Sequence, residues 1–390
     1  MDRRLLVLAL GMFALGTDSF VVAGVLPQIS RAFNVGIGAA GQMTTVYALT
    51  YAVMSPTIAA VCAGVPRKLL LVAGLSLFVV ANLATAVVPA FGLALLTRVL
   101  AGLGAAMFAP TATGAAAQLV APERRGFALS VVIAGLTGAT ALGSPIGTMI
   151  GGLGDWRWTM VFVSVLGAAA ALGVLTLLSQ VPLPPKVGLA QRLAPVADSR
   201  VGLTLLTTLL ALAGNFTVYT YFAVVFDRVI NGSTAVLGGL LITWGLSGTL
   251  ANIVIGRLID KLGSRPVIVT TLSILLLDIA LLPWTGGHLV TAAVAIAVWG
   301  ACGWGLLVPQ QHRLVALAPK SAPVVLGLNT SATYIGVSLA GLIGAAGVQG
   351  IGAHNLGLIS AVMVVLALGV SELASRRIVA RAHTLAAEAL

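Results

Sequence analysis

The chain has 390 residues, of which 59% are hydrophobic and only 8% are charged. Because soluble domains carry about 25% charged residues, this composition excludes a soluble enzyme and predicts a polytopic membrane protein with no separate extramembrane domain. Lys and Arg outnumber Asp and Glu by 21 to 10, an excess that would suggest nucleic-acid binding only in a soluble protein. Cys62 and Cys302 are isolated in apolar sequence and have no metal-ligand spacing, so we expect no metal, no cofactor and no nucleic-acid partner.

Apolar segments long enough to cross a bilayer recur along the whole chain, since a membrane-spanning helix needs about 20 such residues. Six fall at about 5–29, 38–63, 69–88, 91–116, 127–150 and 158–181, and six more at about 201–226, 235–256, 266–284, 288–309, 323–347 and 354–373. The first has the basic start of a signal peptide but a longer apolar run, and we interpret it as a retained span. The sequence therefore predicts an all-α membrane protein of twelve transmembrane helices.

The distribution of cations sets the expected orientation, because the cytoplasmic loops of membrane proteins are enriched in Lys and Arg. With the N-terminus inside, 17 of the 21 cations lie in inner segments and three, Arg31, Arg157 and Arg228, lie in outer loops. The remaining cation, Arg98, lies within a span. We therefore expect a multi-pass membrane protein with both termini in the cytoplasm.

One long polar segment, 182–200, divides the chain into two sets of six spans. It contains Pro182, Pro184, Pro185, Lys186, Arg192 and Arg200. We expect it to be a cytoplasmic linker between an N-terminal bundle (1–181) and a C-terminal bundle (201–390) that ends in a short basic tail. Residues 139–151 of the fifth span resemble residues 332–344 of the eleventh at a constant offset of 193 residues. Parallel repeats of this kind place a substrate between the halves, near the midplane of the membrane.

The segment that follows the eighth span carries the most specific motif. It reads Gly256-Arg257-Leu258-Ile259-Asp260-Lys261-Leu262-Gly263-Ser264-Arg265, which resembles the cytoplasmic G-x-L-x-D-x-x-G-x-R loop signature of the major facilitator superfamily. The equivalent N-terminal loop, 64–68, is shortened and lacks the acid. The resemblance implies two pseudo-symmetric six-helix bundles that transport by alternating access, usually as a monomer.

Shorter motifs are similar to the twelve-span drug:proton antiporter branch of that superfamily, which contains bacterial sugar-efflux and chloramphenicol-efflux proteins. Residues 98–106 resemble the superfamily's R-x-x-x-G-x-G-A-A element, and residues 143–147 are a variant of the antiporter signature G-P-x-x-G-G. Residues 15–20 with Leu26-Pro27, and Gly41-Gln42, Tyr47-Ala48 and Pro56, extend the similarity. The resemblance implies a protein of the bacterial inner membrane that exports a small, largely apolar, drug-like compound in exchange for protons and has a role in multidrug resistance.

Two other functions remain open from the sequence. One is export of a sugar or a nucleoside, for which amide side chains in the cavity matter more than aromatic ones. The other is an uncoupled facilitator or a transporter-like sensor, which would not need a titratable acid in the first span. The sequence has no Walker loop and no nucleophile elbow, so neither an ATP-driven pump nor a membrane enzyme is favoured.

Two charged residues lie deep in the N-terminal spans. Asp18 in the first span and Arg98 in the fourth both fall near the midplane or its outer half. A charge there costs roughly 2.5–3.5 kcal/mol and therefore faces protein or a water-filled cavity. If the two face each other, the carboxylate can alternate between pairing with Arg98 and holding a proton, as proton coupling requires. The alternative is a static ion pair that only orders the N-terminal bundle.

Asp260 is the expected gating residue. The family resemblance implies that it contacts the start of the eleventh span, at Ser321-Ala322-Pro323, and so holds the outward-open state. The helix dipole stabilises an acid at such a position by about 0.3–1 kcal/mol. The gating set is completed by Gly256, Arg265, Gly143 and Pro145, of which the last two are expected to bend the fifth span. Of the other acids, Asp278 is interpreted as a helix-end residue that reaches outer water, and Glu372 as interfacial.

Aromatic and polar residues at helical spacing predict the substrate cavity. The residues concerned are Tyr47 and Tyr51 in the second span, Asn215, Tyr219, Phe222 and Phe226 in the seventh, Trp299 with Gly303 and the adjacent Trp304 in the tenth, and Asn329 and Thr333 in the eleventh. Aromatic rings with a few amides suit a mostly apolar solute. Any one of these residues is more often a packing residue, so the prediction depends on the whole set.

Overall fold

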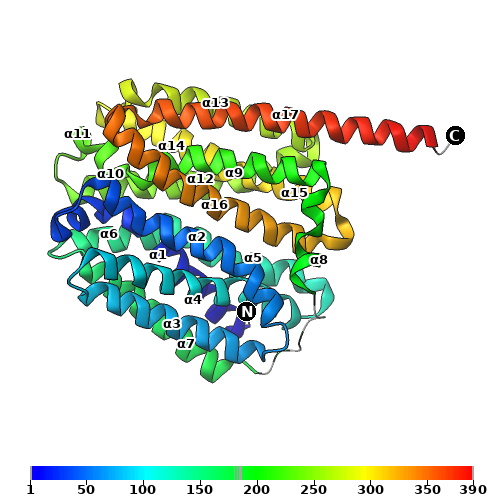
Figure 1. Ribbon diagram of the computed structural model, residues 1–390, viewed down its shortest axis with the longest axis horizontal. Helices are drawn as coiled ribbons and strands as arrows, with labels where there is room; N and C mark the ends of the chain where they lie inside the picture. The colour runs from blue at the N-terminus through cyan, green and yellow to red at the C-terminus, as the bar shows by residue number, and fades with distance from the viewer. Residues whose placement is uncertain (1, 180, 182, 184–186, 389–390) are drawn as a thin grey trace.

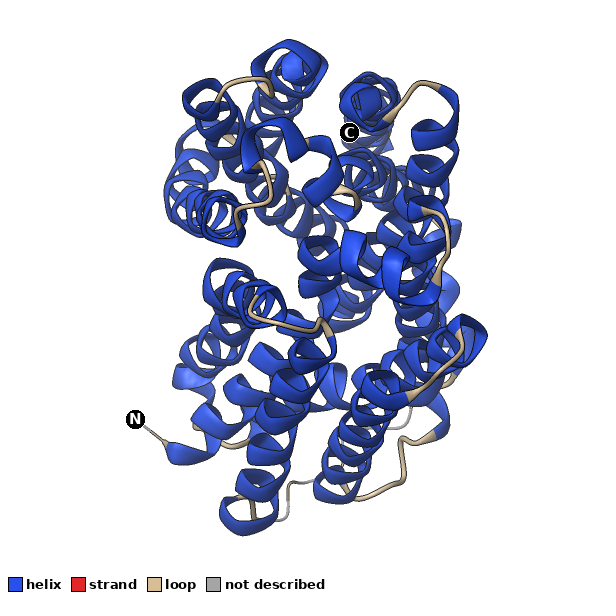
Figure 2. Cartoon of the chain, turned by 90° about the vertical axis from the view of Figure 1, so that its left-hand side faces the viewer, coloured by secondary structure: helices blue, strands red, loops and turns tan. Residues whose placement is uncertain are grey.

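The computed structural model describes residues 2–179, 181, 183 and 187–388. Within these residues every regular element is a helix, and twelve helical segments are long and apolar enough to cross a membrane. Figure 2, a view from one end of the bundle, shows helices joined by loops. The predicted fold class is therefore confirmed. Part of the expected linker, namely Pro182, Pro184, Pro185 and Lys186, lies outside the described residues.

The first six spans lie together on one side of the bundle (Figure 1). They are α1 (Arg3–Phe33), α2 (Ile37–Val61), α3 (Arg67–Val87), α4 (Phe91–Gln118), a fifth span made of α5 (Arg125–Gly138), η2 (Ala139–Gly143) and α6 (Ser144–Gly152), and α7 (Arg157–Leu177). A short 3-10 helix, η1 (Pro122–Arg124), precedes α5. The middle piece of the fifth span, η2, is a turn of π-helix, a feature that is frequent at functional positions.

The last six spans form the other side of the bundle. They are α9 (Ser199–Thr220), which continues into the short α10 (Phe222–Val225) and α11 (Asp227–Ile230), then α12 (Thr234–Leu262), α13 (Ser264–Thr285), α14 (Leu289–Gly305) with α15 (Leu307–Leu317), α16 (Ala322–Gly350) after η4 (Pro319–Ser321), and α17 (Leu356–Glu388) after η5 (Ala353–Asn355). Figure 1 shows α17 extending past the end of the bundle toward the C-terminus.

A short helical connection joins the two sides. It contains α8 (Leu189–Leu193) and η3 (Ala194–Ala197), and Arg192 Nη2 donates to the carbonyl oxygen of Ala59 in α2 at 3.2 Å. Asp198 then caps α9 by accepting from the backbone N–H of Arg200 at 2.9 Å. The hydrogen bond from the Arg200 side chain, the largest contribution, lowers the pKa of Asp198 below its usual value. The carboxylate therefore stays ionised as a cap at neutral pH.

Several helices extend beyond the apolar segments that predicted them. The eighth span ends at Leu262 rather than near residue 256, so Asp260 lies in a helix and not in a loop. The seventh span was expected to reach residue 226, but α9 ends at Thr220 and Tyr221 separates it from α10. The eighth helix is longer because hydropathy marks the apolar core of a membrane helix, whereas its hydrogen-bonded turns continue into the polar interface. The seventh helix ends early because the break at Tyr221 lies inside an apolar segment, where hydropathy gives no signal.

The two sides meet along α2 and α16, which lie side by side in Figure 1. Both Gln42 Nε2 and the Tyr221 hydroxyl donate to the carbonyl oxygen of Gly341, at 3.4 and 2.8 Å. A Cβ atom on Gly41 or on Gly344 would overlap the Tyr221 side chain, so the missing side chains allow this close packing. Because α2 begins and α16 ends here, the contact closes the end of the bundle that is remote from the start of α1.

Candidate transport site

The deepest charges of the N-terminal half form one ion pair. Arg98 of α4 donates from Nη1 to Oδ1 of Asp18 in α1 and from Nη2 to its Oδ2, both at 2.9 Å. The two side chains are 1% and 0% exposed. Such a parallel pair of charge-assisted bonds fixes both side chains and is stronger than a neutral hydrogen bond. The structure therefore brings into contact the two residues that the sequence suggested for proton coupling.

Further side chains surround this ion pair. Asn82 of α3 accepts a hydrogen bond from Arg98 Nη1 at 2.9 Å. The Tyr47 ring of α2 lies 4.7 Å from the guanidinium carbon, a cation–π distance, and its hydroxyl oxygen lies 3.2 Å from that of Ser19. Four helices thus enclose the pair in protein, which is the environment that charges require within a membrane.

The fifth span contains a turn of π-helix next to this site. Its π turn, η2, packs against α1. A Cβ atom on Gly143 would overlap the Thr17 side chain, so the missing side chain of Gly143 allows this contact. Pro145 follows this turn in α6 and, because it has no N–H, cannot donate a helical hydrogen bond. The fifth span stays helical from Arg125 to Gly152, and the bend expected at Gly143 and Pro145 remains a prediction.

The loop motif that follows the eighth span in the sequence, residues 256–265, lies at the end of the bundle where the chain starts. The Asp260 side chain is exposed and forms no hydrogen bond or ion pair with another described residue, so the expected contact with the start of α16 is not formed in this structure. Arg265 instead pairs with Glu372 of α17 at 2.7 Å. A Cβ on Gly256 would meet no atom within 4 Å.

Asp278 lies in the ninth span, about two turns before the end of α13. It is half-buried, and its Oδ2 atom is buried without a hydrogen-bond partner among the described residues. Since α13 ends at Thr285, close to the end expected from the sequence, the expectation that Asp278 reaches outer water stays a prediction. Glu372 is one-third exposed and paired with Arg265, which agrees with an interfacial position.

A cluster of aromatic rings lies where the two halves meet. Trp244 of α12 lies at the centre of this cluster. Its ring centroid is 4.3 Å from that of Tyr219, 5.6 Å from that of Trp299 and 5.5 Å from that of Trp304. Phe216 of α9 packs on the same group. Tyr219 connects the halves, since its hydroxyl donates to the carbonyl oxygen of Phe20 at 3.2 Å and lies 3.3 Å from that of Ser144.

The predicted cavity residues are divided among four locations. Asn215, Tyr219, Phe222 and Trp299 join the aromatic cluster, in which Asn215 Oδ1 accepts from Trp299 Nε1 at 2.5 Å. Asn329 of α16 accepts instead from Thr208 at 2.9 Å, and Thr333 donates to the Asn329 carbonyl oxygen at 3.0 Å. The Tyr51 ring packs across the interface against that of Tyr334, with centroids 4.1 Å apart and a 45° angle between planes, while Tyr47 belongs to the ion-pair site.

Four members of these sites did not stand out in the sequence as cavity or coupling residues: Phe20, Asn82, Phe216 and Trp244. Asn82 had a usable signal, because an amide in the middle of an apolar span needs a partner. The aromatic residues had none, since rings that face lipid and rings that face protein are equally apolar. The spacing of Phe216 and Tyr219 on one helix became informative only with α12 in place.

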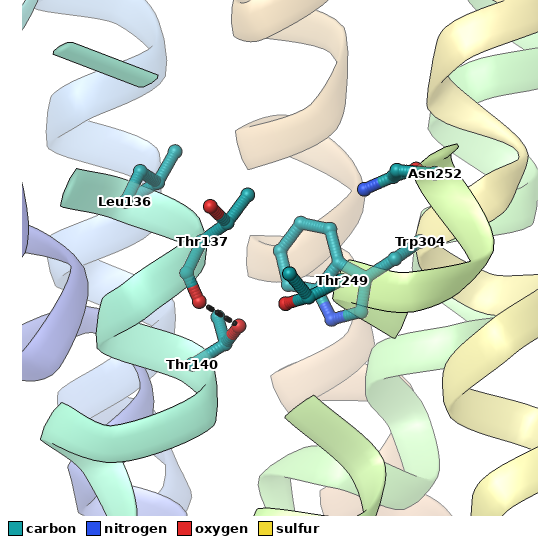
Figure 3. Close-up of a pocket in the computed structure, with 6 residues that line it drawn as sticks. All are labelled: Leu136, Thr137, Thr140, Thr249, Asn252 and Trp304. Atoms are coloured by element: carbon teal, nitrogen blue, oxygen red, sulfur yellow. Dashed lines mark hydrogen bonds between the residues drawn. The ribbon is translucent and has the colours of Figure 1, made fainter. Parts of the chain in front are cut away.

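Beside the cluster the halves enclose a space of about 20 Å³, room for about one water molecule. Figure 3 shows the six side chains that line it: Leu136, Thr137 and Thr140 from the fifth span, Thr249 and Asn252 from α12, and Trp304 from α14. The Thr140 hydroxyl donates a hydrogen bond to the Thr137 carbonyl oxygen at 2.8 Å. Asn252 Oδ1 and Trp304 Nε1 are buried without partners among the described residues.

Comparison with known proteins defines the class to which this helical bundle belongs. The family model of the Major Facilitator Superfamily matches residues 8–341, and the chain is a member of this superfamily of membrane transporters. The crystal structure of the nucleoside transporter NupG superposes with a TM-score of 0.76 at 12% identity, over 96% of this chain and 100% of that one, which shows a shared fold.

Two curated relatives match nearly the whole chain. The "Inner membrane transport protein YdhP" of Escherichia coli (strain K12) is 27% identical over 371 residues, which cover 93% of this chain and 94% of the relative. A "Probable sugar efflux transporter" of Mannheimia succiniciproducens is 26% identical over 367 residues, 92% of this chain and 90% of the relative. These relatives and the twelve apolar helices support a multi-pass protein of the bacterial inner membrane.

Proposed function

We propose that this protein exports a small, largely apolar organic compound in exchange for protons, by alternating access of a central site between its two halves. The observation that carries the proposal is the Asp18–Arg98 pair, in which an acid is buried within the membrane and held by two 2.9 Å bonds. A buried acid is costly and marks proton relays in pumps and transporters. Here it lies on α1, the helix that also contributes Phe20 to the aromatic cluster.

Protonation supplies the coupling step in this proposal. An ionised Asp18 accepts both hydrogen bonds from Arg98, whereas a protonated carboxyl offers a neutral oxygen and one O–H donor. The two protonation states therefore favour different positions of α1 relative to α4. Because Ser19, Phe20 and Asp18 are consecutive on α1, a shift that releases the proton also changes the surface that α1 presents to the C-terminal half.

The orientation of the bundle follows from the same proposal. With both termini in the cytoplasm, the closed contact between α2 and α16 faces outward, and this structure is an inward-facing state. The unpartnered, exposed Asp260 then fits a gate that forms only when the cytoplasmic end closes. Gly256, Arg265, Gly143 and Pro145 belong to the moving parts of this gate. The protein would work as a monomer.

Export of a sugar is the second candidate. It is supported by relatives named as sugar efflux transporters and by the amide and hydroxyl groups of Asn215, Asn329 and Thr208, which hexoses would need. A nucleoside is a related candidate, given the fold shared with a nucleoside transporter. An uncoupled facilitator or sensor is disfavoured by the buried Asp18, which such a protein would not need.

Proton release from the purified protein tests the proposal. Compounds from a panel of uncharged antibiotics, hexoses and nucleosides are added in weakly buffered detergent solution, and the pH change is recorded. We expect release with at least one apolar compound and none from the Asp18→Asn variant, with Asp155→Asn, an exposed outer carboxylate, as the matched control. Release with hexoses alone would establish the sugar exporter, and binding without any release would establish a facilitator.

A further inference from the structure

One aromatic side chain of the N-terminal half is inserted among rings of the C-terminal half. The Phe20 centroid lies 5.8 Å from that of Phe216, 5.9 Å from that of Tyr219 and 5.6 Å from that of Trp304. The first contact is stacked, with a 27° angle between planes, and the other two are edge-on at 90° and 86°. We call these three C-terminal rings, with Trp244, the ring box. In this state the box holds a phenyl group.

The ring box has hydrogen-bond donors that Phe20 cannot satisfy. The Nε1 atoms of Trp244 and Trp304 and the Nδ2 atom of Asn215 are buried without a partner among the described residues. The indole of Trp299 differs, because its Nε1 donates to Asn215 Oδ1. An indole N–H only donates, and leaving such a donor buried and unpaired costs about 1–3 kcal/mol. A phenyl ring fills the box but leaves this cost in place.

The C-terminal helices around the ring box contain no charge at its depth, and the charges nearest to Phe20 along α1, Asp18 and its partner Arg98, are already paired with each other. α14 and α16 have no Asp, Glu, Lys or Arg, and α9 and α12 have them only near their ends, at Arg200, Arg257, Asp260 and Lys261. A charged group placed in the box would lose its hydration without gaining a counterion. The two halves therefore differ, since the N-terminal half contains the buried ion pair and the C-terminal half contains rings with free donors.

We infer that a ring of the transported compound replaces Phe20 in the ring box and that an oxygen on this compound accepts a hydrogen bond from an unpartnered indole N–H of the box, that of Trp244 or that of Trp304. The substrate class is then an uncharged aromatic compound with carbonyl, nitro or ether acceptors. This rests on the proposed function, which it deepens. A hexose fits poorly, because its hydroxyl hydrogens need acceptors, whereas the free groups of the box are donors.

Two ligands that differ in one acceptor test the inference. Benzophenone and diphenylmethane have the same pair of rings, and only benzophenone has a carbonyl oxygen. We expect benzophenone to bind the purified full-length protein about three- to tenfold more tightly than diphenylmethane, because this is the difference in affinity that one net hydrogen bond produces. Equilibrium dialysis measures both affinities, and irradiation of bound benzophenone is expected to label peptides that contain Phe216, Trp244 or Trp304.

Substitution of the indoles separates the donor from the ring. Trp244→Phe and Trp304→Phe keep an aromatic ring and remove the N–H, so at least one of them should reduce the preference for benzophenone while diphenylmethane binding stays within twofold. Trp284→Phe is the matched control, because that indole is 68% exposed on α13, and it should preserve the preference. Phe20→Ala removes the competing phenyl group and should tighten the binding of both ligands.

Several results would overturn the inference. They are equal binding of the two ligands to the native protein, an unchanged preference in both tryptophan variants, equal binding of the anion 4-benzoylbenzoate, and displacement of benzophenone by methyl galactoside. These binding measurements use no proton gradient and leave Asp18 intact. A failure of proton coupling therefore appears in the Asp18→Asn pH experiment alone, and a failure of the ring box appears in the ligand preference alone.

Discussion

The backbone carbonyl of Thr140 lies against Gly245, where the π turn of the fifth span meets α12 across the interface between the halves. A Cβ atom on residue 245 would overlap the carbonyl group of Thr140. The contact is between two backbones, so neither partner can move away by rotating a side chain. The interface at this depth therefore depends on the missing side chain of Gly245.

Gly245→Ala should weaken the closed arrangement seen here. Forcing a methyl group into a packed interface costs about 1–3 kcal/mol, which corresponds to roughly a 5- to 150-fold change in the population of the state. Gly239→Ala is the matched control, since it lies on the same helix and a Cβ there meets nothing within 4 Å. Distances between spin labels at the two ends of the bundle report the populations, and equal populations in both variants would contradict this prediction.

Asp18→Asn should abolish uphill efflux. The amide is nearly the same shape and still offers an oxygen to Arg98, but it cannot release a proton. A carrier with one fixed protonation state cannot convert a pH difference into a substrate gradient. Counterflow of substrate should persist, because exchange needs no net proton movement. Reconstituted vesicles with an imposed pH gradient measure both activities, and uphill efflux by the variant would make Asp18 structural and Asp278 the candidate carrier.

Asp260→Asn should slow the transport cycle and leave substrate affinity unchanged. The substitution removes a charge that has no partner in this state, so the inward-facing state should keep its stability. The helix dipole would stabilise the native acid by about 0.3–1 kcal/mol in the opposite state, which corresponds to roughly a two- to fivefold change in the ratio of states. Turnover and the ratio of inward to outward accessibility are the measurements. If neither changes, Asp260 is an ordinary surface acid.

Labelling of introduced cysteines tests the orientation in the membrane. In a Cys62→Ala, Cys302→Ala background, Ser199→Cys at the start of α9 should resist a membrane-impermeant thiol reagent in cells whose inner membrane is intact. Gly154→Cys, in the exposed connection between α6 and α7, should react. Both labels are expected to form after the cells are lysed. Reaction at residue 199 in intact cells would reverse the orientation.

The twelve spans were predictable because apolar length is the main determinant of a membrane helix. The contact between Asp18 and Arg98 was also within reach of the sequence, since two opposite charges at similar depth in the membrane have few other partners. The residues that surround this pair could not be predicted from the sequence. Asn82 and Tyr47 belong to helices whose rotation about their own axes hydropathy does not specify.

The ring box shows a second limit of the sequence. Trp244, Phe216 and Phe20 are apolar residues in apolar helices, and lipid would solvate them as well as protein does. Only the packing of three helices distinguishes them from Trp284, which is exposed on the surface of α13. The π turn at Ala139–Gly143 was likewise hidden, because it depends on how α1 and α12 pack on the fifth span.

The distance along the chain between the members of the ion pair has a consequence for synthesis. Asp18 and Arg98 are 80 residues apart, so at about 5–20 residues per second the ribosome delivers the arginine roughly 4–16 s after the acid. During that interval α1 has to enter the bilayer with a carboxyl group and no counterion. On insertion scales roughly five to ten Leu, Ile, Val or Phe residues offset one Asp. The strongly apolar composition of α1, with a mean hydropathy of 2.0 in its central window, therefore serves the nascent chain, because it makes insertion favourable before Arg98 exists.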